Sequence, residues 1–222
     1  MGPFSRCRWV HHTGTALRTR RIQRSVPGKR RSSARRAYNH AGSTPRTSKA
    51  TRRPIRRITA NSARRCFCTQ LRITPLWQAE LGLPEIGPGG FGENFTVDGL
   101  TEENACIGDI YAIGEAQIQV TGPRYPCWKI ERRWGIEGLT ARVAETGRTG
   151  WYCRVVQEGM VEPGMFVTLI ERPYPEWTVA LTNDFSHSRN KDVERAEALA
   201  ACPLLHEFWQ QLVVRCAMRK KK

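Results

Sequence analysis

The residue best suited to chemistry in this sequence is a cysteine in a short, stiff, positively charged segment. Cys127 lies between a proline and a tryptophan within Gly122–Lys129, with Arg124 and Lys129 on either side. Thiolate is the form of cysteine that reacts and binds soft metals, and nearby positive charge favours it. Cys127 is therefore a candidate metal ligand or a carrier of transferable sulfur. From residue type alone, a small buried apolar role is the alternative.

The two cations beside the cysteine suggest an anionic ligand. Arg124 offers a planar fork of donors and Lys129 a point charge, and either can pair with an oxyanion or lower the pKa of the thiol. The alternative is a pair of solvated charges flanking a turn.

Two further polar stretches are candidate parts of the same site. Glu93 and Asn94 follow a glycine-rich loop, in which Gly92 would let the backbone approach a ligand. A turn in which Asn94 bonds its own backbone is the alternative. Arg148 precedes a strand and could reach an anionic ligand, or it could be a cation at a helix C-terminus.

The elements that must position these residues are mostly short strands. A strand-like run spans Asp109–Val120, and it delivers Cys127 just beyond its end. Glycine and aspartate turns separate the strands, which favours a β-barrel or sandwich. The other predicted strands are Phe95–Val97, Trp151–Val156 and Met165–Ile170, and short helices are predicted at Leu76–Leu81 and Ile136–Thr146.

After residue 175 the pattern becomes helical. Helices are predicted at Thr178–Phe185, from Asp192 to Ala201, and from Pro203 to Met218. Apolar residues recur at helical spacing in the last of these, so we expect its aromatic residues to serve as core. The predicted organisation is residues 1–74, a mostly β domain at 75–175 and a small helical domain at 176–222.

The charge of the chain is concentrated in its first third. Residues 1–75 contain 20 basic and no acidic residues, whereas the rest contains 16 basic and 20 acidic residues, so the net charges are +20 and −4. Residues 1–74 lack apolar periodicity, and we expect them to be disordered. Three interpretations are open: a segment read from a wrong frame or start, a basic tail or transit-like peptide, and a nucleic-acid-binding arm.

The remaining composition points to a reducing compartment. Eight cysteines are dispersed without disulfide-scaffold or zinc-finger spacing, and Cys106, Cys153, Cys202 and Cys216 are expected to be structural. We find no signal-peptide pattern and no apolar run of about 18 residues that would cross a membrane. A cytoplasmic protein without a membrane partner is expected.

Four motifs together resemble the MOSC family, which occurs at the C-terminus of molybdenum cofactor sulfurases and as stand-alone bacterial proteins. The chain looks most like the YiiM type, which adds a three-helix C-terminal domain. The motifs are Gly92–Thr101, Ile107–Asp109, Pro123–Lys129 and Arg148–Val155. In this family, strands with a His- and Gly-rich segment normally precede the Gly-Glu-Asn loop. Here an arginine-rich stretch replaces them, so we expect a barrel that lacks its first strands and exposes unpaired edges.

The resemblance implies a mostly β, barrel-like fold followed by helices. It implies binding of molybdenum cofactor, with Cys127 at the family's cysteine position as catalytic thiolate and metal ligand. It places Arg124, Lys129, Glu93, Asn94 and Arg148 around the cofactor, and the family is also associated with pyridoxal phosphate binding. It suggests reduction of small N-hydroxylated substrates such as hydroxylaminopurines.

Three functions therefore compete. The first is a molybdenum-dependent reductase that takes electrons from a partner reductase, because the sequence shows no Rossmann, haem or iron–sulfur motif. The second is a non-catalytic carrier of sulfur or cofactor that uses a Cys127 persulfide. The third, less favoured, is nucleic-acid binding through the basic N-terminus, which lacks the aromatic residues of a base-stacking surface.

Overall fold

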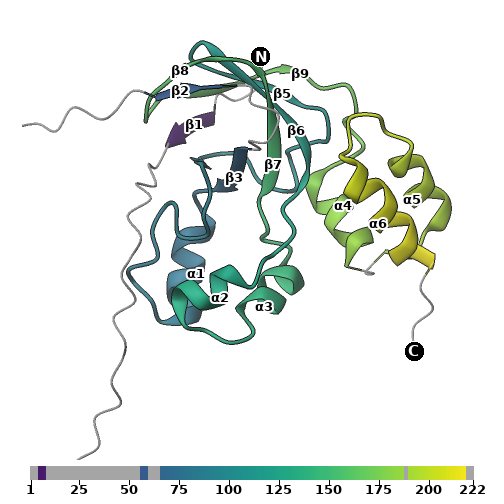
Figure 1. The fold of residues 1–222 in the computed structure, drawn as a ribbon, viewed down its shortest axis with the longest axis horizontal. Coiled ribbons are helices and arrows are strands. Elements are labelled where there is room, and N and C mark those ends of the chain that lie inside the picture. The colour runs from purple at the N-terminus through teal and green to yellow at the C-terminus, as the bar shows by residue number, and fades with distance from the viewer. Residues whose placement is uncertain (1–4, 9–55, 60–65, 188–189, 219–222) are drawn as a thin grey trace, which may run out of the picture. The chain divides into compact units, whose positions relative to one another are not determined.

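A closed β-barrel forms the centre of the folded chain. The computed structural model describes residues 5–8, 56–59, 66–187 and 190–218 (Figure 1). The strands follow one another around the barrel in the order β1-β4-β3-β7-β6-β5-β9. They are β1 (Ser5–Arg8), β3 (Cys66–Gln70), β4 (Phe95–Val97), β5 (Ile110–Ile113), β6 (Ala116–Pro123), β7 (Trp151–Gln157) and β9 (Phe166–Glu171). The prediction of a mostly β barrel followed by helices is confirmed.

The barrel closes through strands that the basic N-terminal segment supplies. β1 pairs antiparallel with both β4 and β9, and β3 pairs parallel with β4 and antiparallel with β7. The sequence predicts an incomplete barrel, and the structure differs because strand pairing uses backbone groups, which an arginine-rich segment also has. A separate two-stranded sheet joins β2 (Arg56–Ile58) to β8 (Gly159–Val161).

Most of residues 1–74 lies outside the described residues, so the prediction of disorder there stays a prediction. The exceptions are residues 5–8, 56–59 and 66–74, and the last of these ranges includes β3, whose Phe67 and Cys68 are buried in the folded unit. Ordered structure therefore begins before residue 75, the boundary that the sequence suggests. The hypothesis of a nucleic-acid-binding arm concerns residues that the structure does not describe.

The predicted single strand over Asp109–Val120 is a hairpin. β5 and β6 pair antiparallel from Ile110–Gln119 to Ile113–Ala116, with Gly114 at the turn. Gly114 has a φ of 58°, a conformation that favours glycine, and a Cβ there would lie 2.7 Å from the sulfur of Met165. The alternating pattern continues through both strands, which is why it did not reveal the turn.

Three short helices gather at one end of the barrel around a core of their own (Figure 1). They are α1 (Ile73–Leu81), α2 (Lys129–Trp134) and α3 (Leu139–Thr146), and each ends at a glycine in the left-handed conformation. α1 and α3 end where the predicted helices end, but α1 begins three residues earlier and α3 three residues later than predicted, and α2 was not predicted. The core contains Phe67, Ile73, Trp77, Ile86, Phe91, Ile130, Leu139 and Val143.

Three C-terminal helices pack against the barrel. α4 (Val179–Ser186) and α5 (Val193–Ala200) begin after Thr178 and Asp192, whose side chains accept hydrogen bonds from backbone N–H groups of the first turn. α6 (Glu207–Met218) begins four residues later than predicted. The buried residues of these helices are continuous with the barrel core. Among the described helices, none has the length and hydrophobicity needed to cross a bilayer.

The packing of α6 on β6 depends on one glycine. Gly122 has a φ of 151°, and a Cβ at this position would overlap the indole of Trp209 in α6. We therefore expect Gly122→Ala to lower the free energy of unfolding by about 1–3 kcal/mol through overpacking. Urea denaturation of the variant and the wild type measures this difference in the free energy of unfolding. Gly87→Ala is the control, because no atom lies within 4 Å of the added methyl group, and equal stability of the two variants would contradict the predicted contact.

Candidate functional site

Cys127 lies in a pocket of about 410 Å³ between the end of β6, the start of α2 and the glycine-rich loop. The lining residues combine aromatic rings, cations and one thiol, and they are Phe67, Phe91, Gly92, Asn94, Arg124, Cys127, Lys129, Ile130, Arg133 and Tyr152. Four of the predicted site residues are therefore brought together here: Arg124, Lys129, Asn94 and Cys127.

The backbone fixes the position of the thiol. Cys127 immediately precedes Trp128, the N-cap residue of α2, and its carbonyl accepts a hydrogen bond from the N–H of Ile130 at 3.1 Å. Ile130 is buried in the core of the helices at this end of the barrel. The side chain of Cys127 is half-buried, so it faces the pocket from a rigid turn and stays open to a ligand.

Arg124 brings a buried positive charge to the pocket wall. The residue is 6% exposed, and its guanidinium lies 4.6 Å from the centroid of the Phe67 ring. Within the described residues, its Nη1 has no hydrogen-bond partner. Burial lowers the pKa of Arg124, while Tyr152, Glu93 and Cys127 counteract this effect. A buried donor without a partner is costly, so an anion in this pocket would stabilise the site.

Asn94 connects the glycine-rich loop at the pocket to strand β3 of the barrel. Its Oδ1 accepts a hydrogen bond from the N–H of Phe67, and its own N–H donates to the carbonyl of Phe67, both at 2.8 Å. These bonds extend the parallel pairing of β3 and β4 by one residue. Asn94 therefore has a structural role and also lines the pocket.

Glu93 supports the loop instead of lining the pocket. Its buried carboxylate accepts hydrogen bonds from the N–H of Gly89 at 2.6 Å, the N–H of Phe91 at 3.0 Å and the hydroxyl of Thr96 at 3.2 Å. The stretch is thus a turn held by Glu93, whereas the predicted bond of Asn94 to its own backbone is replaced by its bonds to Phe67. Glu93 acts on the pocket indirectly, since its charge favours the protonated form of Arg124.

Several pocket residues escaped the sequence reasoning. Arg133 lies one helical turn after Lys129 on α2, a spacing that places both on one helix face. Tyr152 comes from β7, and Phe67 comes from β3. The four-residue spacing of Lys129 and Arg133 indicates a shared face only if residues 129–134 form a helix, which was not predicted. Phe67 was missed because it lies in the segment for which disorder was expected.

Comparison with known proteins identifies the family and the fold of this chain. The MOSC domain model matches residues 56–168, just over half of the chain. This chain belongs to the MOSC family. The crystal structure of YiiM from Escherichia coli superposes with a TM-score of 0.68 at 26% identity, covering 78% of this chain and 89% of that one. A YiiM-like MOSC fold is thereby confirmed.

Two relatives match this MOSC chain over part of their length. The uncharacterized protein YflK of Bacillus subtilis is 38% identical over 148 residues, which are 67% of this chain and 64% of YflK. A protein of Gibberella moniliformis named "Reductase" is 37% identical over 138 residues, which are 60% of this chain and 24% of that protein. The chain thus spans less than two thirds of either relative.

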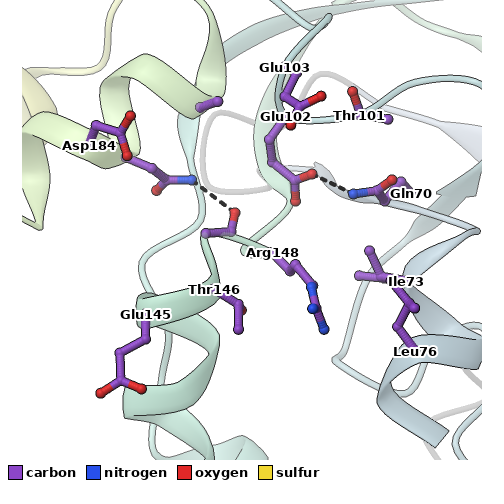
Figure 2. Close-up of a pocket in the computed structure, with 13 residues that line it drawn as sticks. Gln70, Ile73, Leu76, Thr101, Glu102, Glu103, Glu145, Thr146, Arg148 and Asp184 are labelled. Carbon is purple, nitrogen blue, oxygen red and sulfur yellow. Dashed lines mark hydrogen bonds between the residues drawn. The ribbon is translucent and has the colours of Figure 1, made fainter. Parts of the chain in front are cut away.

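Arg148 of the MOSC domain lies outside the Cys127 pocket. It lines a second pocket of about 430 Å³, shown in Figure 2 together with Glu102 and Gln70. Its Nη1 donates to the carboxylate of Glu80, and its guanidinium lies 5.1 Å from the Trp77 ring centroid. The structure therefore places Arg148 beside Glu80 and not among the residues that line the Cys127 pocket, whereas Tyr152 on the strand that follows does line it.

Glu102 holds together the wall of this second pocket. Its two carboxylate oxygens accept hydrogen bonds from the N–H of Gly150 and the side chain of Gln70, both at 2.8 Å. Burial raises the pKa of Glu102 despite these bonds. Both oxygens are engaged, so Glu102 links β3 to the loop before β7 and is not a free acid or base.

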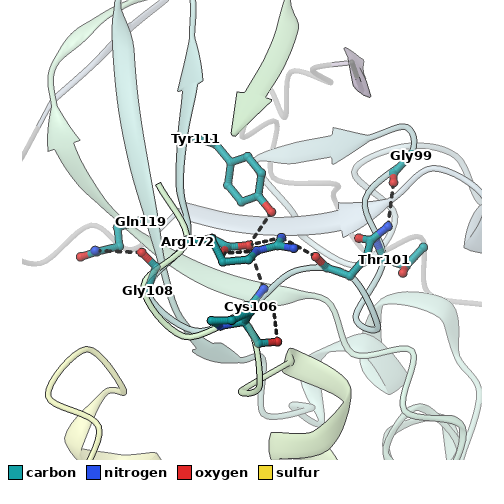
Figure 3. A network of polar contacts seen from close by, with 10 residues as sticks. Gly99, Thr101, Cys106, Gly108, Tyr111, Gln119 and Arg172 are labelled. Carbon is teal, nitrogen blue, oxygen red and sulfur yellow. Dashed lines mark hydrogen bonds and ion pairs between the residues drawn. The ribbon is translucent and has the colours of Figure 1, made fainter. Parts of the chain in front are cut away.

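The Ile107–Asp109 motif of the MOSC domain has a structural role, because its aspartate holds a buried network of hydrogen bonds. Asp109 is fully buried, and its carboxylate accepts hydrogen bonds from Arg172 at 2.9 and 2.7 Å, from the Tyr111 hydroxyl at 2.7 Å and from the N–H of Cys106 at 2.9 Å. Figure 3 shows Tyr111, Arg172 and Cys106 lying close together in this network. The hydrogen bond to Asp109 raises the pKa of Arg172, and burial raises that of Tyr111.

Cys127 should differ sharply from the other thiols in reactivity. Of the seven cysteines from Cys66 to Cys216, Cys127 alone is half-buried and the other six are buried. Burial raises the pKa of Cys66 to about 12 and also raises that of Cys106. We expect iodoacetamide at pH 8 to label Cys127 at least about 100-fold faster than these six, because alkylation needs an accessible thiolate. Mass spectrometry of peptides from samples taken over time measures the labelling rate of each cysteine. A labelling rate of Cys202 comparable to that of Cys127 would refute the prediction.

Proposed function

We propose that this MOSC protein is a molybdenum-cofactor-dependent reductase of N-hydroxylated compounds, in which Cys127 is the protein's thiolate ligand. The observation that carries the proposal is the buried Arg124, whose Nη1 has no hydrogen-bond partner among the described residues, in the same pocket as the half-buried thiol of Cys127. A soft thiolate ligand beside anion-binding donors suits a cofactor that carries both a metal and anionic groups.

The residues of the pocket fit such a group. Arg124, Lys129 and Arg133 would neutralise the anionic groups, and the half-buried Tyr152 offers aromatic surface for a flat ring system. The described residues include no cluster of three or more His, Cys, Asp or Glu side chains able to hold a metal. The proposal therefore requires the metal to arrive with the cofactor's own ligands, to which Cys127 adds one. The family's association with pyridoxal phosphate stays an expectation.

The proposed reaction reduces an N-hydroxylamine to an amine. Two electrons and two protons convert R–NHOH into R–NH2 and water, and the N–O bond is the bond that breaks. When bound, the cofactor supplies a metal that exchanges two electrons with the substrate. Cys127 would hold that metal in the pocket, while the cations keep the cofactor and an anionic substrate in place. The electrons would come from a partner protein, and the name of the Gibberella relative, "Reductase", supports this class of chemistry.

The experiment is to produce the full chain in a host supplied with molybdate and to measure molybdenum per chain. Reduced methyl viologen then serves as electron donor for a hydroxylaminopurine. We expect near-stoichiometric molybdenum and two oxidised viologens per aminopurine formed. A chain that binds no molybdenum, or a loaded chain that leaves the hydroxylaminopurine unchanged, would be evidence against the proposal.

A second candidate function is sulfur transfer without turnover. It is favoured by the exposure of Cys127, which is open enough to accept a sulfur atom from a persulfide donor: the thiolate takes the outer sulfur, and the donor leaves as a thiol. A persulfide on Cys127 by mass spectrometry, together with no hydroxylaminopurine reduction by the loaded chain, would favour this function over the reductase.

A further inference from the structure

We propose that three exposed aromatic residues beside the Cys127 pocket form a docking surface for an acidic electron-donor protein. This aromatic patch consists of Tyr125, Trp128 and Phe208. The inference rests on the reductase function proposed above, because it names the surface through which that reaction would receive its electrons.

All three side chains of the patch are well exposed. Tyr125 is 50% exposed, Trp128 57% and Phe208 46%. Exposed apolar side chains that lie together mark interaction sites, and aromatic residues dominate binding energy there. Tyr125 and Phe208 are in ring contact, and Trp128 follows Tyr125 by three residues at the start of α2. Trp128 adjoins Cys127 in the chain, so a partner seated on the patch would stand next to the pocket.

The core of the folded chain holds part of the patch rigid. The ring of Tyr125 contacts those of Phe208, Trp209 and His187, with centroid distances of 5.8, 6.0 and 6.2 Å. Trp209 is buried against Gly122 of β6. Because the α6 side of the patch is already ordered, a partner that binds there would lose little side-chain freedom. This arrangement also assigns a role to α6, which reaches the site loop through its aromatic residues.

The positive charge next to the patch favours an acidic partner. Lys129, Arg132 and Arg133 are exposed on α2. Glu131, the acidic residue among them, accepts a hydrogen bond from the N–H of Thr140 at 2.9 Å and is turned toward α3. The α6 side of the patch carries the acidic Glu207, which precedes Phe208. Positive charge is therefore concentrated on the α2 side of the patch. An acidic protein would be steered to this side, where the pocket lies.

The chemistry requires such a partner. Each N–O bond that is reduced consumes two electrons, and a reduced flavoprotein can supply both while solvent supplies the two protons. The flavin is oxidised as the hydroxylamine becomes an amine and water. An acidic flavoprotein is therefore the occupant to which the proposal commits.

The test compares two electron donors on the molybdenum-loaded full chain. Reduced methyl viologen needs no docking surface, whereas a reduced acidic flavodoxin does. In the double variant Phe208→Ser/Arg132→Glu, and separately in Arg132→Glu, we expect flavodoxin-driven turnover to fall at least about 10-fold, with viologen-driven turnover unchanged. Leu169→Ser is the matched control, since it removes an exposed apolar side chain, 42% exposed, on β9; both rates should be unchanged.

Two outcomes would overturn the docking surface. One is flavodoxin-driven turnover of the patch variants equal to wild type, and the other is an equal loss with both donors. If viologen itself drives no turnover of the wild type, the reductase proposal has failed instead. Calorimetry of the unloaded chain with flavodoxin then decides the surface: binding weakened at least about 10-fold in the double variant supports it, and absent or unchanged binding refutes it.

Discussion

Replacing Cys127 by serine should abolish molybdenum binding by the purified chain. Serine keeps the size of the side chain but removes the soft thiolate, and the described pocket residues offer no second sulfur ligand. Loss of an outer-sphere partner of a metal ligand typically costs 10–100-fold in affinity, so loss of the ligand itself should cost more than about 100-fold. Molybdenum per chain, measured by mass spectrometry of the metal, should fall to the level of a preparation grown without molybdate.

The control for this experiment is Cys202→Ala. Cys202 is buried beside α5 and belongs to the core shared by the barrel and the C-terminal helices. This variant should unfold more easily yet keep its molybdenum. Full molybdenum content in Cys127→Ser would remove the ligand role, whereas loss of molybdenum in both variants would show that the readout follows stability and not ligation.

Replacing Asp109 by asparagine should produce the largest loss of stability among single changes of similar size. The buried carboxylate accepts four hydrogen bonds, including both from Arg172. Asparagine would present donors to donors and would leave the Arg172 charge without its partner. We expect the free energy of unfolding to fall by about 2–4 kcal/mol, as when one member of a buried ion pair is removed.

Urea denaturation measures this change, and Asp98→Asn is the matched control. Asp98 pairs with Arg72 at 3.9 Å, and both side chains are well exposed, so its replacement should change stability by no more than about 0.5 kcal/mol. A change of less than about 1 kcal/mol in Asp109→Asn would mean that water replaces the carboxylate at Arg172, and the motif would lose its structural role.

Local patterns predicted the elements whose formation depends on neighbouring residues. Phe95–Val97 was predicted as a strand with its observed bounds. The cap of α5 at Asp192 was also predicted, because a capping side chain and the first turn lie within four residues. Thr178 was predicted as the first residue of a helix, and it is the cap of α4. The hairpin at Gly114 and helix α2 were missed. In both cases the local sequence is compatible with more than one local structure, and tertiary packing decides which of them forms.

For the site, the sequence by itself determined the chemistry that is available: a cysteine held between proline and tryptophan, with Arg124 and Lys129 beside it. These residues are close in the chain, so proximity follows from covalent connection. Only the tertiary structure decided which distant residues join them. Strand pairing turns Tyr152 and Phe67 toward Cys127, whereas Arg148, four residues before Tyr152, pairs with Glu80 in another pocket. A long-range contact depends on how separate strands and helices pack, and no local pattern encodes that.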